Sequence, residues 1–177
     1  MRDYSALCDF ERRYVRPAPG RTLIVGSKLY EGRDDRRKLY PDAVGIDMLP
    51  GDGVDVVHNL EEAPPKSLGK FAHVECWSVL EHSRKPWRLA ANLQRLMEPG
   101  ATLYLTVPMV WRVHGYPSDY FRFTKEGVRA LFEEIGWHWL CLAHEELKKN
   151  DMVPTIEGPT GHSYFARTEV CAFGVRK

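Results

Sequence analysis

Two short apolar runs, one ended by a glycine and the other by an aspartate, most constrain the fold of this chain. Leu23–Val25 precede Gly26, and Val44–Ile46 precede Asp47. The spacing suits a strand, a helix and a second strand. In an open parallel sheet the ligand crevice lies outside the carboxyl ends of the strands, where a glycine permits close backbone approach and a carboxylate can bind both ribose hydroxyls. The pattern therefore favours an α/β sheet that binds a nucleotide-like ligand.

The rest of the chain continues this alternation of strands and helices. Apolar runs predict strands at about 21–26, 43–47, 54–57, 72–77, 102–107, 137–143 and 163–175, and helical spacing predicts helices at about 3–16, 32–39, 86–97 and 125–135. Thr124 is the expected N-cap of the last helix, with its hydroxyl accepting a bond from the amide near Gly127, and Gly136 is the expected end. Because two consecutive strands follow residue 136, the prediction is a Rossmann-like, seven-stranded, mostly parallel sheet with a terminal antiparallel hairpin and helices on both faces.

Length and composition indicate one soluble domain. A chain of 177 residues is the size of a single domain, with an N-terminal helix expected within 1–19 and a core within 20–177. The apolar runs are all shorter than the ~20 residues that a membrane span needs, and the N-terminus has no signal-like apolar stretch. The four cysteines are widely scattered, which favours reduced thiols in the cytoplasm. A net charge of +1 gives no electrostatic footprint for nucleic acid.

Five segments, in this order, carry a resemblance to a known family. Residues 22–26, 44–47, 79–82, 98–108 and 114–124 resemble successive motifs of class I S-adenosylmethionine-dependent methyltransferases of the type 11 group. The similarity covers roughly residues 20–140. It implies that S-adenosyl-L-methionine is the cofactor and that the reaction is methyl transfer to a small-molecule acceptor, such as an oxygen or nitrogen of a sugar or a natural-product-like compound.

The resemblance places the cofactor along the first four predicted strands. The turn after the first strand lacks the middle glycine that a dinucleotide pyrophosphate requires, which argues against a nicotinamide. The cofactor-binding residues that we expect are Gly26, Ser27, Asp47, Met48, Asn59, Leu60, Trp77 and Ser78. Asp47 would bind the ribose, Met48 would pack on the adenine, Asn59 and Leu60 would flank the base, and Trp77 and Ser78 would line the cofactor. The alternatives are a plain tight turn at Gly26 and an aspartate that caps the turn at Pro50–Gly51.

Two further segments supply candidates for catalysis and acceptor binding. His82 follows the fourth strand, and residues 112–124 follow the fifth with an unusual density of His, Asp, Tyr and Arg. The candidate catalytic residues are His114, His82 and Asp119, with one histidine as the base and Asp119 orienting His114. The candidate substrate-binding residues are Tyr116, Tyr120 and Arg122. In the alternative interpretation Glu81 and His82 only hold their turn, while Asp119, Tyr120 and Arg122 dock the loop against the next helix.

Other chemistries have little support in the sequence. The histidines and cysteines lack metal-ligand spacing, so no required metal is expected, and motifs for methylating DNA bases are absent. A nucleic-acid acceptor and a membrane partner are therefore not expected, and the oligomeric state is left open between monomer and homodimer. Two other hypotheses stay open, a cofactor-binding partner or regulatory protein without its own turnover and a nicotinamide-dependent oxidoreductase.

Overall fold

The computed structural model describes residues 11–31, 34–115, 117–142, 155–157, 163–165 and 169–177, and residues 11–14 are helical. The strands are β1 Thr22–Val25, β2 Ala43–Asp47, β3 Val56–Val57, β4 Phe71–Trp77, β5 Met97–Pro108, β6 Ile135–Leu142, β7 Thr155–Glu157, β8 Ser163–Phe165 and β9 Glu169–Arg176. The α-helices are α2 Pro86–Leu96 and α3 Lys125–Leu131, and the 3₁₀ turns are η1 Arg36–Leu39, η2 Lys66–Leu68 and η3 Leu80–His82. No helix within the described ranges has both the length and the apolar character that a membrane span requires.

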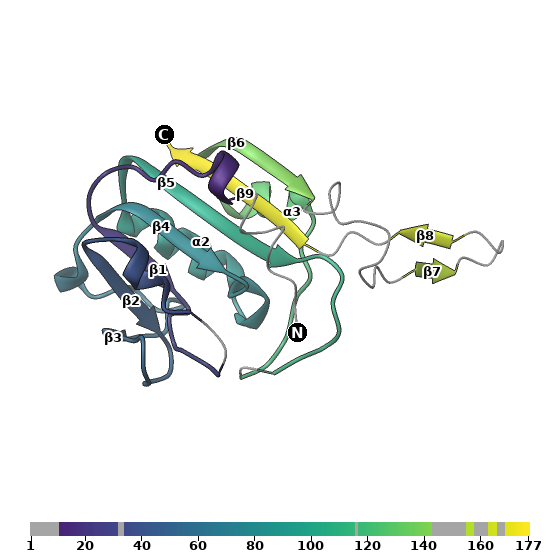
Figure 1. The fold of residues 1–177 in the computed structure, drawn as a ribbon, viewed down its shortest axis with the longest axis horizontal. Coiled ribbons are helices and arrows are strands. Elements are labelled where there is room, and N and C mark those ends of the chain that lie inside the picture. The colour runs from purple at the N-terminus through teal and green to yellow at the C-terminus, as the bar shows by residue number, and fades with distance from the viewer. Residues whose placement is uncertain (1–10, 32–33, 116, 143–154, 158–162, 166–168) are drawn as a thin grey trace.

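Seven strands form one sheet in the order β3-β2-β1-β4-β5-β9-β6 (Figure 1). The strands β1 to β5 pair in parallel, whereas β9 lies antiparallel to both β5 and β6. β7 and β8 form a separate two-stranded sheet. The predicted mostly parallel sheet with a terminal antiparallel hairpin is confirmed. Since Val25 is in register with both Ile46 and Cys76, the carboxyl ends of β1, β2 and β4 meet at one edge.

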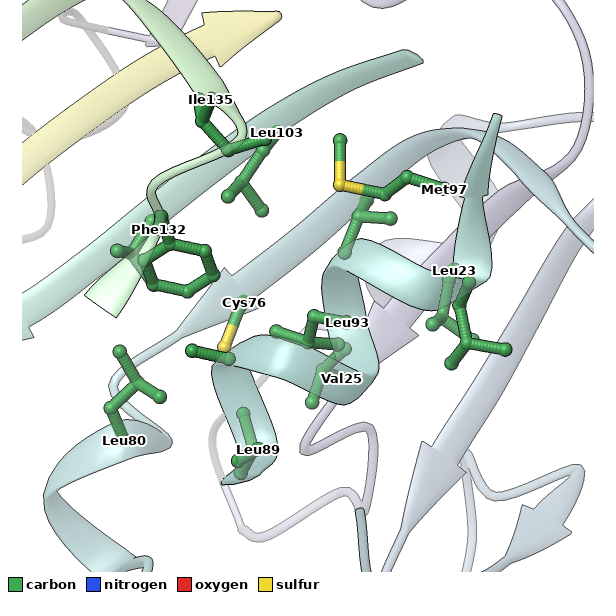
Figure 2. Packing of buried hydrophobic residues seen from close by; sticks show 14 of the residues in the cluster. Leu23, Val25, Cys76, Leu80, Leu89, Leu93, Met97, Leu103, Phe132 and Ile135 are labelled. Carbon is green, nitrogen blue, oxygen red and sulfur yellow. The ribbon is translucent and has the colours of Figure 1, made fainter. Parts of the chain in front are cut away.

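One face of the sheet packs against α2 and α3. Helix α2 buries Leu89, Ala90, Leu93 and Leu96, a spacing of three and four that turns one stripe inward. Figure 2 shows Leu89 and Leu93 beside the strands that carry Val25 and Cys76, with Phe132 and Ile135 near Leu103. This cluster is the main hydrophobic core.

The opposite face of the sheet carries buried polar side chains. Glu75, in the middle of β4, is fully buried and binds the guanidinium of Arg36 and the hydroxyl of Tyr40. Arg36 also pairs with Glu11, so this network ties the helical residues 11–14 and η1 to the sheet. Burial alone would raise the pKa of Glu75, but the hydrogen bonds and charge of Arg36, with bonds from His73 and Tyr40, lower it to about 2.

Several element boundaries differ from the prediction. The N-cap at Thr124 is confirmed, since its hydroxyl accepts from Gly127 N at 3.1 Å. The prediction that Gly136 ends the helix is wrong, because α3 ends at Leu131 and Gly136 lies inside β6, paired with Val175 of β9. The helix expected at 32–39 is only the four-residue turn η1 within the described residues. Most of the helix expected at 3–16 lies outside the described residues.

Candidate functional site

The turn after β1 is held tightly against the turn after β4. Gly26 has a φ of +69°, a left-handed conformation that side chains disfavour. A Cβ atom at this position would lie 2.5 Å from Val79 Cγ2. The backbone of the expected cofactor turn therefore lies where only glycine fits, close to the segment that leads into η3.

Asp47 ends β2 at the same edge, with its carboxylate already partly engaged. Oδ1 accepts from the amide of Leu49 at 2.9 Å, and Oδ2 accepts from the amide of Lys28 at 3.2 Å. The carboxylate thus caps the turn that follows β2, in line with the alternative in which Asp47 is a capping residue. It also accepts a hydrogen bond from the turn after β1. Each carboxylate oxygen has a second lone pair that can accept a ribose hydroxyl.

The side chain of the neighbouring Ser27 is turned inward. It is buried, and its hydroxyl has no hydrogen-bond partner among the described residues. The hydroxyl oxygen lies 2.7 Å from where a Cβ atom of Gly45 would be, so it packs against β2. The glycine turn and the half-buried carboxylate of Asp47 are therefore the features of this edge that could hold the sugar part of a nucleoside cofactor.

The three residues expected around the adenine base differ in exposure and in hydrogen bonding. Met48 exposes 44% of its surface, so its flexible thioether is available to an aromatic ring. Leu60 is buried in the main core, and its carbonyl accepts from Asn92 Nδ2 at 2.9 Å. The side-chain carbonyl of Asn59 accepts from the amide of Glu61 at 3.0 Å. This bond leaves the side-chain amino group of Asn59 as its available donor.

The end of β4 combines packing with an unusual backbone. The ring of Trp77 lies edge-on to Tyr104 at 5.3 Å, and the guanidinium of Arg36 lies 3.9 Å from its centroid. Trp77 therefore packs within the sheet face that carries Glu75. Ser78 has a φ of 51° and is the one non-glycine residue with a positive φ in the described part of the chain. Such conformations cluster at functional sites, where the surrounding structure holds them.

The structure brings His82 and His114 together, although they come from segments far apart in the sequence. Their rings are 4.8 Å apart and nearly perpendicular. His82 Nδ1 lies 2.7 Å from the carbonyl of Ser118, and the fully buried carboxylate of Glu81 lies 3.8 Å from His82 Nε2. Burial lowers the pKa of His82, more than the Ser118 carbonyl raises it, so this imidazole is neutral near pH 7.

Asp119 holds the loop that carries His114. Its carboxylate accepts from the backbone amide of His114 at 3.0 Å and lies 2.9 Å from the ring Nδ1 of the same residue. Arg122 binds both carboxylate oxygens, and it donates to the carbonyls of Trp111 and Arg112 at 3.1 Å each. These bonds from Arg122, above all, hold the pKa of Asp119 well below its usual range.

The remaining acceptor candidates have different placements. The guanidinium of Arg122 is engaged within the loop itself, and none of these bonds reaches the next helix, which the docking alternative expected. Tyr120 is 45% exposed, with Arg84 lying 6.0 Å from its ring centroid, and is open to a ligand. Tyr116 lies outside the described residues.

Two hollows in the described part of the chain lie away from these side chains. One, of about 230 Å³, lies between Arg21 and Leu68, and the other, of about 400 Å³, lies between Glu61 and Arg95. Neither is lined by a candidate site residue among those described.

Two acidic residues have larger roles than the sequence indicated. Glu81 joins the histidine pair with its buried carboxylate, whereas the prediction gave it only a turn-holding role. Its carbonyl does hold the loop, accepting from the amides of Tyr120 and Phe121 at 2.7 and 3.3 Å. Glu75 was not anticipated, although an acidic residue inside an otherwise buried strand is itself a signal of a paired charge.

Comparison with known proteins gives matches through structure alone. No protein-family model matches the chain, and no curated protein matches it by sequence. An S-adenosylmethionine-dependent methyltransferase from Clostridium acetobutylicum matches with a TM-score of 0.64 at 6% identity, covering 99% of this chain and 92% of that one.

Two further matches were solved with S-adenosylhomocysteine. The N-methyltransferase NodS from Bradyrhizobium japonicum has a TM-score of 0.58 at 11% identity, covering 98% of this chain and 85% of NodS. The 1,6-didemethyltoxoflavin-N1-methyltransferase from Burkholderia thailandensis, also bound to 1,6-didemethyltoxoflavin, has a TM-score of 0.61 at 13% identity, covering 98% and 77%. With β9 inserted antiparallel between β5 and β6, the chain has the fold of the class I S-adenosylmethionine-dependent methyltransferases, and S-adenosylmethionine is the cofactor of that fold.

Proposed function

We propose that this protein transfers a methyl group from S-adenosylmethionine to an oxygen or nitrogen of a small-molecule acceptor, such as a sugar or a natural-product-like compound. The observation that carries the proposal is the contact between His82 and His114 beyond the carboxyl ends of β4 and β5. Val79, just before η3, lies against the Gly26 turn, so this position adjoins the edge where we propose that the cofactor binds. A pair of imidazoles there can accept the proton that an acceptor hydroxyl or amine must lose.

The cofactor would be held by groups on β1 and β2. Asp47 would bind the ribose beside the Gly26–Ser27 turn, and Met48 would cover the adenine. When bound, the cofactor supplies a methyl group that its sulfonium already makes electrophilic. The protein then has to align the acceptor, exclude water and remove one proton.

The proton would go to His114, the histidine that Asp119 orients. The carboxylate of Asp119 contacts both the backbone amide and Nδ1 of His114, which fixes the ring and leaves Nε2 for the acceptor. His82 is the second candidate, since its Nδ1 is engaged with the Ser118 carbonyl and its Nε2 is directed to the same cluster. General-base catalysis of this kind contributes roughly 10²- to 10⁴-fold.

Cofactor binding is tested first, by thermal unfolding with S-adenosylmethionine, S-adenosylhomocysteine, NAD and NADP in parallel. A ligand at 100 times its Kd adds about 2.7 kcal/mol, which is a shift of roughly 5–10 °C for a domain of this size. We expect only the first two to shift the midpoint and Asp47→Ala to abolish the shift. Asp52→Ala, an exposed aspartate in the adjacent turn, is the matched control. A shift by the nicotinamides would overturn the proposal.

Turnover is tested by S-adenosylhomocysteine release with a panel of hydroxyl and amine acceptors. We expect His114→Ala to lower turnover at least 100-fold while the cofactor Kd stays within about threefold. His138→Ala, an exposed histidine on β6, should leave both unchanged. Equal losses in turnover and cofactor affinity would remove His114 as the base. Cofactor binding without release on any acceptor would favour the alternative of a non-catalytic cofactor-binding partner.

A further inference from the structure

Glu81, His82 and His114 form a compact group of possible metal ligands. One ligand atom from each lies within 4.8 Å of the others. Zinc binds histidine nitrogen at about 2.0–2.1 Å and carboxylate oxygen at about 2.0–2.2 Å, so tetrahedral ligand atoms lie roughly 3.4 Å apart. We propose that these three residues bind a divalent transition-metal cation of the Zn²⁺ type. The widest separation has to contract from 4.8 Å by roughly 1.4 Å to do so.

The hydrogen bonds around the two imidazoles are those of metal-bound histidines. His82 Nδ1 is 2.7 Å from the Ser118 carbonyl, which leaves Nε2, the atom 3.8 Å from Glu81 Oε1, for the cation. His114 Nδ1 is 2.9 Å from Asp119 Oδ2 and 3.2 Å from the Arg112 carbonyl, which again leaves Nε2. A metal-ligating histidine almost always gives its other ring nitrogen to a carboxylate or a carbonyl, which fixes the ring.

The local charge also suits a cation. Two carboxyl groups, those of Glu81 and Asp119, lie in this group beside one guanidinium, that of Arg122. Arg122 is bound on both of its terminal nitrogens by Asp119. Two imidazoles and one carboxylate select zinc-like cations, whereas Mg²⁺ and Ca²⁺ prefer oxygen ligands alone.

Three protein ligands leave at least one coordination position open, as in catalytic zinc sites. The site lies beyond the carboxyl ends of β4 and β5, where the acceptor is proposed to bind. An acceptor hydroxyl in the open position would have its pKa lowered by the cation. This role rests on the proposed methyl transfer and replaces His114 as the proton acceptor there, because an Nε2 atom bound to the cation has no lone pair for a proton. Binding of the cation does not rest on the methyl transfer.

The test is a Co²⁺ titration of the metal-free, full-length protein, followed by visible absorption and by displacement with Zn²⁺. We expect one equivalent to bind, with affinity reduced at least tenfold in His82→Ala and in His114→Ala. Asp119→Asn, which keeps the ligands but alters the residue that orients His114, should weaken binding about 10- to 100-fold. His138→Ala is the matched control and should bind as the unaltered protein does, and Mg²⁺ should not displace Co²⁺.

Unchanged Co²⁺ affinity in both histidine variants would overturn the inference, as would equal loss in His138→Ala or no binding at all. Circular dichroism checks that each variant is folded. We expect His114→Ala to fold, because His114 lies in a loop. Calorimetry with S-adenosylmethionine on the metal-free protein separates the two proposals. If the cofactor does not bind but Co²⁺ binding maps to the histidines, the proposed function fails and the cation site stands.

Discussion

Replacing Gly26 by alanine should destabilise the protein through one identifiable contact. The added Cβ would lie 2.5 Å from Val79 Cγ2, a separation that side-chain atoms do not tolerate. Gly100 is the matched control, because its φ of +79° is also left-handed but a Cβ there meets nothing within 4 Å. The two substitutions therefore share the backbone strain and differ in the steric clash.

The magnitude follows from these two contributions. A left-handed conformation costs a non-glycine residue about 1–2 kcal/mol, offset by about 0.4–1 kcal/mol through the stiffer unfolded chain. Gly100→Ala should therefore cost roughly 0–1.6 kcal/mol. Overpacking adds about 1–3 kcal/mol, so Gly26→Ala should lower the free energy of unfolding by roughly 1–4.6 kcal/mol.

Urea unfolding followed by tryptophan fluorescence measures both variants. Truncating Val79 removes the clashing methyl group. In a Val79→Ala background, the destabilisation caused by Gly26→Ala should therefore be smaller by at least about 1 kcal/mol. Equal destabilisation by Gly26→Ala and Gly100→Ala would refute the steric argument. Additive effects of Gly26→Ala and Val79→Ala would show that the clash lies elsewhere.

Three further predictions concern stability. Because the pKa of Glu75 is lowered from 4.5 to about 2, its contribution to the free energy of unfolding is present above about pH 5 and is lost as the pH falls toward 2. Urea unfolding across this range should show that the free energy of unfolding falls by roughly 3 kcal/mol less in Glu75→Gln than in the unaltered protein. Parallel pH profiles of the two proteins would contradict this. Leu93→Ala, at a fully buried position in α2, should cost about 2–5 kcal/mol by the same assay, whereas Leu39→Ala, at a residue 61% exposed, should cost almost nothing. Asp119→Asn should cost about 1–3 kcal/mol by weakening its bonds to Arg122, and amide hydrogen exchange at His114 should accelerate; unchanged exchange would count against the loop network.

Much of the fold could be predicted because local pattern and tertiary structure agree in it. The run Val44–Ile46 and its terminal Asp47 form β2 as expected, and the stripe from Pro86 forms α2. The helix predicted after Thr124 is right for Val128 and Leu131, which lie in α3, but not for Ile135. Ile135 is buried as the first residue of β6 rather than the end of a helix, since pairing with β9 overrides the local spacing.

The candidate site was only partly predictable from the sequence. His82 and His114 were each identified from their places after strands, but their contact depends on how the loop 109–122 folds back over η3. The same contact explains why sequence spacing gave no sign of a metal site, since two of the ligands adjoin in η3 and the third lies in another loop. The covering of the second sheet face depends on the charge pair of Arg36 and Glu75, which no periodicity encodes.

The turn η3 has a consequence for how ligands would influence one another. Val79, just before η3, packs against the Gly26 turn, and Glu81 and His82 within it bind the backbone of residues 118–121. The η3 turn therefore connects the Gly26 turn to the loop that carries His114. By thermodynamic linkage, if a ligand beside His114 changes the affinity for a ligand at the Gly26 turn, the second ligand changes the affinity for the first by the same factor.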